Sequence, residues 1–159
     1  ADIVGLLCLR PAKAGGQSRI VSTVTIFNAL RRAHPELVAR LFEPFRLDRR
    51  DGQQPGQSPV SWITPCGFDG ERLRTFYHSD YFRSIERHPG IELTAEERAI
   101  LDFYDACAAD PAFYLDMWLE PGDMQFISNH TVAHARTAYQ DFDDPALKRH
   151  LLRLWLSVP

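Results

Sequence analysis

The chain has 159 residues, 45% of them hydrophobic, which suits one domain with a substantial apolar core. Its formal net charge of −3 gives no electrostatic reason to expect a nucleic acid or an anionic membrane as partner, and no apolar run reaches the roughly 18 residues of a membrane span. The three cysteines (Cys8, Cys66 and Cys107) are scattered and odd in number, which predicts reduced thiols in a cytoplasmic protein rather than a disulfide framework or a thiolate zinc site.

Two strands are predicted at the start of the chain. Residues 3–10 form a continuous apolar run that stops at Pro11, which is typical of a buried strand followed by a turn. The chain begins directly at this run, without an initiator methionine or a basic leader, so we expect it to be the remainder of a longer chain. A short strand over 17–22 follows the Gly15-Gly16 turn.

The middle of the chain, residues 24–112, is predicted to be a helical and loop insertion. A helix follows the second strand, and Pro35 is well placed to open another short one. The clearest helix pattern lies over 94–109, where Thr94 and Glu97 have the spacing of a capping box.

The same region also contains an expected loop and two expected strands. Residues 48–59 lack periodicity and are dense in turn formers, which indicates an exposed loop. Strands are predicted at 60–65 and 72–77, joined by a turn at Phe68-Asp69-Gly70.

Strand patterns return in the last third of the chain. They cover 113–119 and 124–128 and continue to His134, whose neighbours favour a strand over a helix. In the tail, 149–157, residues alternate as in a strand with one polar and one apolar face, although a helix would also place its two arginines on one side. Strands at both ends with helices between them favour a mainly β fold, such as a sandwich or jelly roll, with a helical insertion.

A series of motifs near the end of the chain points to a family. In chain order they are Pro121-Gly122-Asp123, an apolar strand over 124–127, Asn129, His134-Ala135-Arg136 and Arg149. This order resembles the C-terminal signature of the iron(II)/2-oxoglutarate oxygenases of the taurine dioxygenase and clavaminate synthase-like superfamily. The resemblance covers nearly the whole chain. It implies a double-stranded β-helix (jelly roll) in one oxygenase domain, 1–159, that lacks its N-terminal part and forms an incomplete barrel.

The resemblance also implies a set of site residues. His134 would be one ligand of the metal, with the other two ligands, a His-x-Asp pair, expected upstream of Ala1. Arg149 would bind the 5-carboxylate of 2-oxoglutarate with help from the hydroxyl of Ser18, since a guanidinium offers a planar fork that matches a carboxylate. Arg153, on the same side of the tail, would contact the cosubstrate or an anionic group of the substrate. The implied cofactor and cosubstrates are Fe(II), 2-oxoglutarate and O₂.

The implied activity is oxidative decarboxylation of 2-oxoglutarate coupled to hydroxylation, or a related oxidation, of a small polar and possibly anionic molecule. The insertion would then cover the site and select the substrate. Two other functions stay open: a jelly-roll binding module without a metal, and a zinc-dependent hydrolase that uses His130 and His134. The hydrolase is less favoured because no glutamate follows His130, so the H-E-x-x-H pattern fails. His78-Ser79-Asp80 has the composition of the missing ligand pair, but it lies on the wrong side of Gly15-Gly16, and we expect a solvated turn there.

Overall fold

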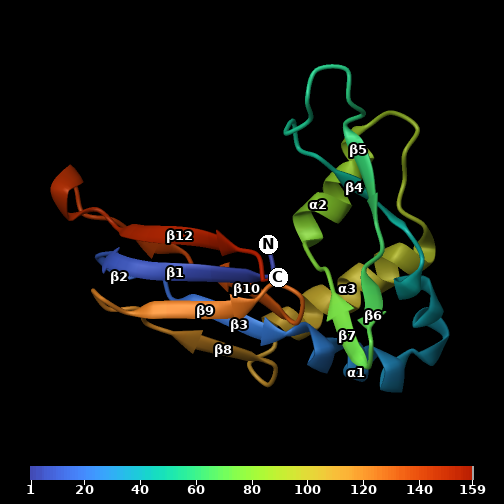
Figure 1. Cartoon of the computed structure of the whole chain (residues 1–159), viewed down its shortest axis with the longest axis horizontal. Coiled ribbons are helices and arrows are strands. Elements are labelled where there is room, and N and C mark those ends of the chain that lie inside the picture. The colour runs from blue at the N-terminus through green and yellow to red at the C-terminus, as the bar shows by residue number, and fades with distance from the viewer. Residues whose placement is uncertain (159) are drawn as a thin grey trace. The chain divides into compact units, whose positions relative to one another are not determined.

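The structure is a computed structural model that describes residues 1–158, and it divides the chain into two compact units (Figure 1). The first, here called the β-unit, combines Ala1–Ser22 with residues 111–158. The second, the inserted unit, is Thr23–Asp110. The bounds of the inserted unit lie within two residues of the insertion expected at 24–112. That this unit covers the site stays a prediction.

Two three-stranded antiparallel sheets make up most of the β-unit. The first has the strand order β12-β1-β9, formed by His150–Leu156, Ile3–Arg10 and Met124–Ser128. These three strands lie side by side in Figure 1. The second sheet has the order β10-β3-β8, formed by Val132–Arg136, Ser18–Ser22 and Tyr114–Met117.

A two-stranded ribbon and a short 3-10 helix complete the β-unit. The ribbon pairs β2 (Ala14–Gly15) with β11 (Tyr139–Gln140), and the 3-10 helix spans Pro145–Leu147. The tail of the chain is therefore a strand, β12, and it pairs with the first strand of the chain. This pairing resolves the choice between strand and helix that the alternation of residues left open.

The strand register determines which side chains of the β-unit share a face. Leu6 on β1 lies opposite Gln125 on β9 and also opposite Arg153 on β12. In the second sheet Ser18 on β3 lies opposite Arg136 on β10. Directly opposed residues of an antiparallel pair project from the same face of the sheet. Leu6, Gln125 and Arg153 therefore share one face of the first sheet, and Ser18 and Arg136 share one face of the second.

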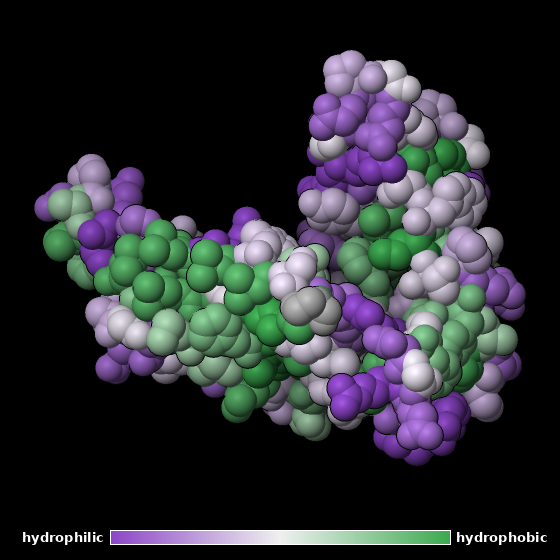
Figure 2. All heavy atoms as spheres, viewed as in Figure 1, coloured by the Kyte–Doolittle hydropathy of each residue, from purple (hydrophilic) through white to green (hydrophobic). Residues whose placement is uncertain are grey.

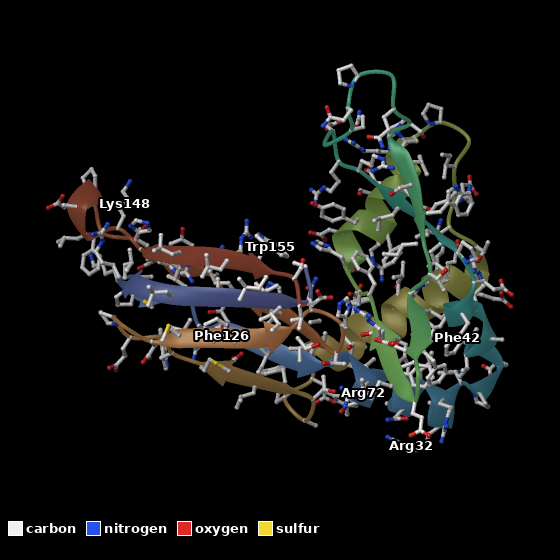
Figure 3. The ribbon with its side chains drawn as sticks, in the orientation of Figure 1. Arg32, Phe42, Arg72, Phe126, Lys148 and Trp155 are labelled. Atoms are coloured by element: carbon white, nitrogen blue, oxygen red, sulfur yellow. The ribbon has the colours of Figure 1, made fainter. Side chains whose placement is uncertain are left out.

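The other face of the β12-β1-β9 sheet is apolar and exposed. Gly5 lies opposite both Phe126 and Leu154, and an ideal Cβ on Gly5 would come within 2.9 Å of the Phe126 ring. Met124, Phe126 and Leu154 are 65%, 56% and 55% exposed. Phe126 is labelled in Figure 3, and hydrophobic atoms gather over this sheet in Figure 2. A contiguous apolar face of this kind is unusual for a soluble surface that has no partner.

The inserted unit combines helices with two small hairpins. Its elements are α1 (Thr23–Ala33), 3-10 turns at Pro35–Leu37 and Ala39–Phe42, β4 (Phe45–Asp48), β5 (Val60–Ile63), β6 (Cys66–Asp69), β7 (Arg72–Thr75), α2 (Ser79–Arg83), a 3-10 turn at Ser84–Arg87 and α3 (Ala95–Ala109). Its core consists of fully buried apolar side chains, among them Ile26, Leu30, Phe45, Phe82 and Ile100. No helix among residues 1–158 is both long enough and apolar enough to cross a membrane.

The capping box predicted for the long helix is present at the start of α3. The Thr94 hydroxyl accepts a hydrogen bond from the Glu97 backbone N–H at 3.1 Å, and the Glu97 carboxylate accepts one from the Thr94 N–H at 2.7 Å. Two otherwise unpaired N–H groups are thereby satisfied, which fixes the first turn of the helix.

Two local predictions for the inserted unit were wrong. The strands expected at 60–65 and 72–77 do not form one hairpin: β5 pairs with β4, and β7 pairs with β6, so residues 66–69 are a strand and the turn falls after them. The segment at His78 is exposed at His78 and Asp80, as expected, but it begins a helix rather than forming a turn. Ser79 begins α2, and its hydroxyl donates to Asp105 at 2.8 Å, which holds the helix start against α3.

Candidate functional site

One cavity in the β-unit brings together the four residues that the sequence suggested for the site. Its volume is about 400 Å³, in the range of small-molecule sites. Five polar and three apolar residues line it: Ser18, His134, Arg136, Arg149, Arg153, Leu6, Ala135 and Leu151. We call it the arginine cavity. Segments more than 100 residues apart in the sequence meet here because the first and last strands of the chain pair with each other.

Strand alternation accounts for the lining on the β12 side. Arg149, Leu151 and Arg153 are two residues apart and all line the cavity, whereas Leu152 and Leu154 belong to the exposed apolar face. The period of two along a strand sends successive side chains to opposite faces. The same rule on β10 places Arg136, the last residue of the His134-Ala135-Arg136 motif, beside His134 in the lining.

Arg149 is held by contacts at both its backbone and its side chain. Its N–H donates to the Asp141 carboxylate at 2.7 Å. An ideal Cβ on Gly16 would lie only 3.3 Å from Arg149 Nε, and Gly16 has a φ of +81°, which side-chain-bearing residues rarely adopt. Glycine at this position therefore leaves room for the Arg149 guanidinium.

One aromatic ring contacts two of the cavity arginines. The Tyr139 ring centroid is 4.1 Å from Cζ of Arg136 and 5.5 Å from Cζ of Arg149. Contacts of this kind hold a guanidinium plane without neutralising its charge. Tyr139 was not identified from the sequence, because its position depends on the short β2–β11 pairing, which carries no strand pattern.

Ser18 is joined to a residue of the facing sheet. Its hydroxyl donates to the Gln125 side-chain oxygen at 2.6 Å, and both residues are buried, with 6% and 8% of their surface exposed. Gln125 was also missed by the sequence analysis. The available signal was a single amide at an inward position of the strand Met124–Ser128, between the apolar residues Met124 and Phe126.

The charge of the arginine cavity fits a small dianion. The lining contains three guanidinium groups and no carboxylate. The field of Arg149 extends to the neighbouring thiol: burial raises the pKa of Cys8, and the positive charge of Arg149 acts in the opposite direction. A guanidinium pairs with a carboxylate through two parallel N–H donors, so these residues fit a dicarboxylate such as 2-oxoglutarate.

For a metal ion, the cavity lining offers one imidazole, His134. Within residues 1–158, no group of three or more His, Cys, Asp and Glu side chains is arranged to hold a metal ion. An Fe(II) site of the two-histidine, one-carboxylate type needs three protein ligands. His134 fits one of them, and the described residues do not supply the other two beside it.

The two other histidines considered from the sequence lie elsewhere. His130 Nε2 is 2.7 Å from the Asp2 carboxylate, and this hydrogen bond, together with one from the Val158 backbone N–H, lowers the pKa of Asp2 to about 2. His134 is on a strand, so His130 and His134 do not occupy successive turns of a helix, as the zinc alternative required. His78 belongs to the inserted unit, where its side chain is exposed but partly desolvated, which lowers the pKa of its imidazole.

Comparisons with known proteins assign the chain to a family. The model of a family described as taurine catabolism dioxygenase TauD, TfdA family matches residues 1–155. FR-33289 synthase of Streptomyces rubellomurinus is 34% identical over 160 residues, which cover 99% of this chain and 47% of the synthase. Uridine-5'-phosphate dioxygenase of an Amycolatopsis species is 28% identical, over 97% of this chain and 55% of that protein. The chain thus spans about half the length of these curated relatives.

A solved structure shows the same fold. Asparagine oxygenase in complex with Fe(II), 2S,3S-3-hydroxyasparagine and succinate superposes with a TM-score of 0.64 at 19% identity, covering 96% of this chain and 44% of that one. The predicted mainly β, jelly-roll fold is confirmed by this likeness. Because the family model matches nearly the whole sequence, the chain belongs to the TauD, TfdA family of taurine catabolism dioxygenases.

Proposed function

We propose that the protein containing this chain is an Fe(II)- and 2-oxoglutarate-dependent oxygenase. It would couple oxidative decarboxylation of 2-oxoglutarate to hydroxylation, or a related oxidation, of a small polar molecule. The observation that carries the proposal is the arginine cavity, where a histidine and three arginines line one small space. Family membership and the Fe(II) and succinate bound by asparagine oxygenase add support, since succinate is what remains of 2-oxoglutarate after decarboxylation.

His134 is the proposed metal ligand in this chain. Bound Fe(II) supplies the redox chemistry by which O₂ is reduced at the expense of 2-oxoglutarate. Because the chain covers only 47% of FR-33289 synthase, we assign the two remaining ligands, a His-x-Asp pair, to a part of the full-length protein outside this chain.

Arg149 is proposed to bind the distal carboxylate of 2-oxoglutarate, with the Ser18 hydroxyl as a further donor. Its guanidinium offers two parallel N–H donors, Gly16 leaves room for it, and the Tyr139 ring contacts it. A fixed fork of this kind orients the cosubstrate so that its 2-oxo acid end faces the histidine side of the cavity.

The substrate is proposed to be anionic. Arg136, Arg149 and Arg153 together carry more positive charge than one distal carboxylate neutralises, so Arg153 has capacity for a second anionic group. A relative named for uridine-5'-phosphate, which carries a phosphate, is consistent with this assignment. We also propose that the protein acts in the cytoplasm, because Cys8, Cys66 and Cys107 are free thiols.

Succinate formation tests the proposal. The purified full-length protein, supplied with Fe(II), 2-oxoglutarate and O₂, should form succinate slowly even without its substrate, and His134→Ala should abolish this. A protein that binds no Fe(II) and forms no succinate would be a jelly-roll binding module instead. Stoichiometric zinc in the purified protein, lost in His130→Ala, would support the hydrolase.

A further inference from the structure

We propose that Gln125 is a positioning residue that controls the direction of the Ser18 hydroxyl group. In one orientation of the Gln125 amide, Ser18 donates its hydrogen to Gln125. In the other, Gln125 donates to Ser18, and the Ser18 hydrogen becomes available to the distal carboxylate of 2-oxoglutarate. This inference rests on the proposed function and assigns a role to a residue that does not itself line the cavity.

The contact between the two sheets is short and buried. Ser18 Oγ and Gln125 Oε1 are 2.6 Å apart, and Ser18 is the only one of the two that lines the arginine cavity. With the amide in this orientation, the hydroxyl hydrogen points to Gln125. A hydroxyl has one hydrogen to donate, so Ser18 then offers only lone pairs to the cavity, and lone pairs repel a carboxylate.

The other end of the same amide has no partner. Gln125 Nε2 is buried and makes no hydrogen bond within residues 1–158. The residue opposite Gln125 on β1 is Leu6, whose side chain offers no acceptor. Buried amide donors are usually satisfied, and leaving one unpaired carries a cost in free energy, so the observed orientation is not strongly favoured over its alternative.

Rotation of the amide by 180° exchanges its oxygen and nitrogen. Nε2 would then donate to Ser18 Oγ, and the Ser18 hydrogen would turn toward the cavity. Without a ligand, this orientation leaves the hydroxyl hydrogen unused. A bound carboxylate supplies an acceptor for it and adds a charge-assisted hydrogen bond, so the anion selects the rotated amide. Gln125 thereby couples the presence of an anion to the donor state of Ser18.

The test measures binding rather than turnover. The full-length protein, loaded with Mn(II) under anaerobic conditions, is titrated by calorimetry with 2-oxoglutarate and with 2-oxopentanoate. The second compound has the same chain length and the same 2-oxo acid end but a methyl group in place of the distal carboxylate. Gln125→Met keeps the size of the side chain and removes its hydrogen bonds. It should weaken 2-oxoglutarate about 3- to 10-fold, because Ser18 Oγ loses the N–H donor that turns its hydrogen toward the cavity although the hydroxyl itself remains, while 2-oxopentanoate changes by less than about 2-fold.

A double-mutant cycle separates positioning from packing. If Gln125 acts through Ser18, then Ser18→Ala alone should produce a loss at least as large as that of Gln125→Met, and the double variant should bind no worse than Ser18→Ala. Additive losses would overturn the inference, and so would equal losses for both oxo acids. Gln125→Glu is the second variant in case the methionine protein does not fold. It accepts the Ser18 hydrogen permanently and brings a like charge near, so it should weaken 2-oxoglutarate at least as much as Gln125→Met does.

The two proposals fail in different ways. If the unmodified Mn(II) protein binds neither oxo acid, the proposed function is wrong. If it binds 2-oxoglutarate more tightly than 2-oxopentanoate and Gln125→Met leaves that preference unchanged, the proposed function stands and the role of Gln125 is refuted.

Discussion

Replacing Arg149 with alanine should remove the main interaction with the distal carboxylate of 2-oxoglutarate. The guanidinium lines a cavity of about 400 Å³ beside Gly16 and Tyr139, where the carboxylate would be largely enclosed. Loss of a charge-assisted partner in such a place costs about 2–4 kcal/mol, which corresponds to a loss of about 30- to 1000-fold in affinity. Arg149→Lys should recover only part of this, because an ammonium group lacks the two-donor fork.

The assay for Arg149 is an anaerobic titration of the Fe(II)-loaded full-length protein with 2-oxoglutarate, followed by the metal-to-ligand charge-transfer band. Arg19→Ala is a matched control, since Arg19 neighbours Ser18 but pairs with Asp116 at 2.7 Å and does not line the cavity. This control should bind 2-oxoglutarate normally. Unchanged affinity in Arg149→Ala, with lost affinity in Arg153→Ala, would refute the assignment and move the carboxylate site four residues along the chain, to Arg153 on β12.

Four further outcomes are expected. His134→Ala should abolish turnover with little change in the thermal midpoint, whereas His78→Ala should retain most activity, and the reverse result would show that the ligand assignment is wrong. The 159-residue chain alone should not retain stoichiometric Fe(II) in metal analysis, because its described part offers no three-ligand cluster, and tight iron in it would contradict this. Gly16→Ala should lower both stability and 2-oxoglutarate affinity, while Gly122→Ala, with a φ of +96° and nothing within 4 Å of an added Cβ, should lower stability alone. At pH 8 all three thiols should react with a thiol reagent only after unfolding. Burial raises the pKa of Cys66 to about 12 and also raises the pKa values of Cys8 and Cys107. Rapid labelling of the native protein would argue against this burial.

Local sequence patterns were sufficient for the elements that carry their own signal. The apolar run at β1 and the Thr94–Glu97 capping box each specify a strand or a helix without help from the rest of the chain. The strand β4, Phe45–Asp48, was missed because half of its residues are charged. Its charged side chains are satisfied by distant partners: Arg46 donates to the Glu92 carbonyl at 2.8 Å, and Asp48 pairs with Arg87 at 2.7 Å. Tertiary contacts of this kind leave no periodicity in the sequence.

The predicted site residues came from the resemblance to a family, and the structure adds what that resemblance did not contain. Ser18, His134, Arg149 and Arg153 lie around one cavity, although their roles there stay predictions. Gln125 offered only a weak sequence signal, one amide in an apolar strand, because its contact with Ser18 spans 107 residues of sequence and depends on the pairing of β9 with β1.

The most direct test of the central claim compares Fe(II) and 2-oxoglutarate binding in three forms of the full-length protein: unmodified, His134→Ala and Arg149→Ala. Equilibrium dialysis against Fe(II), followed by labelled 2-oxoglutarate, gives both quantities for each form. If one cavity holds the metal at its histidine end and the distal carboxylate at its arginine end, His134→Ala should lose Fe(II). Arg149→Ala should keep Fe(II) and bind 2-oxoglutarate at least about 30-fold more weakly. Retention of Fe(II) by His134→Ala at the level of the unmodified protein would contradict the account.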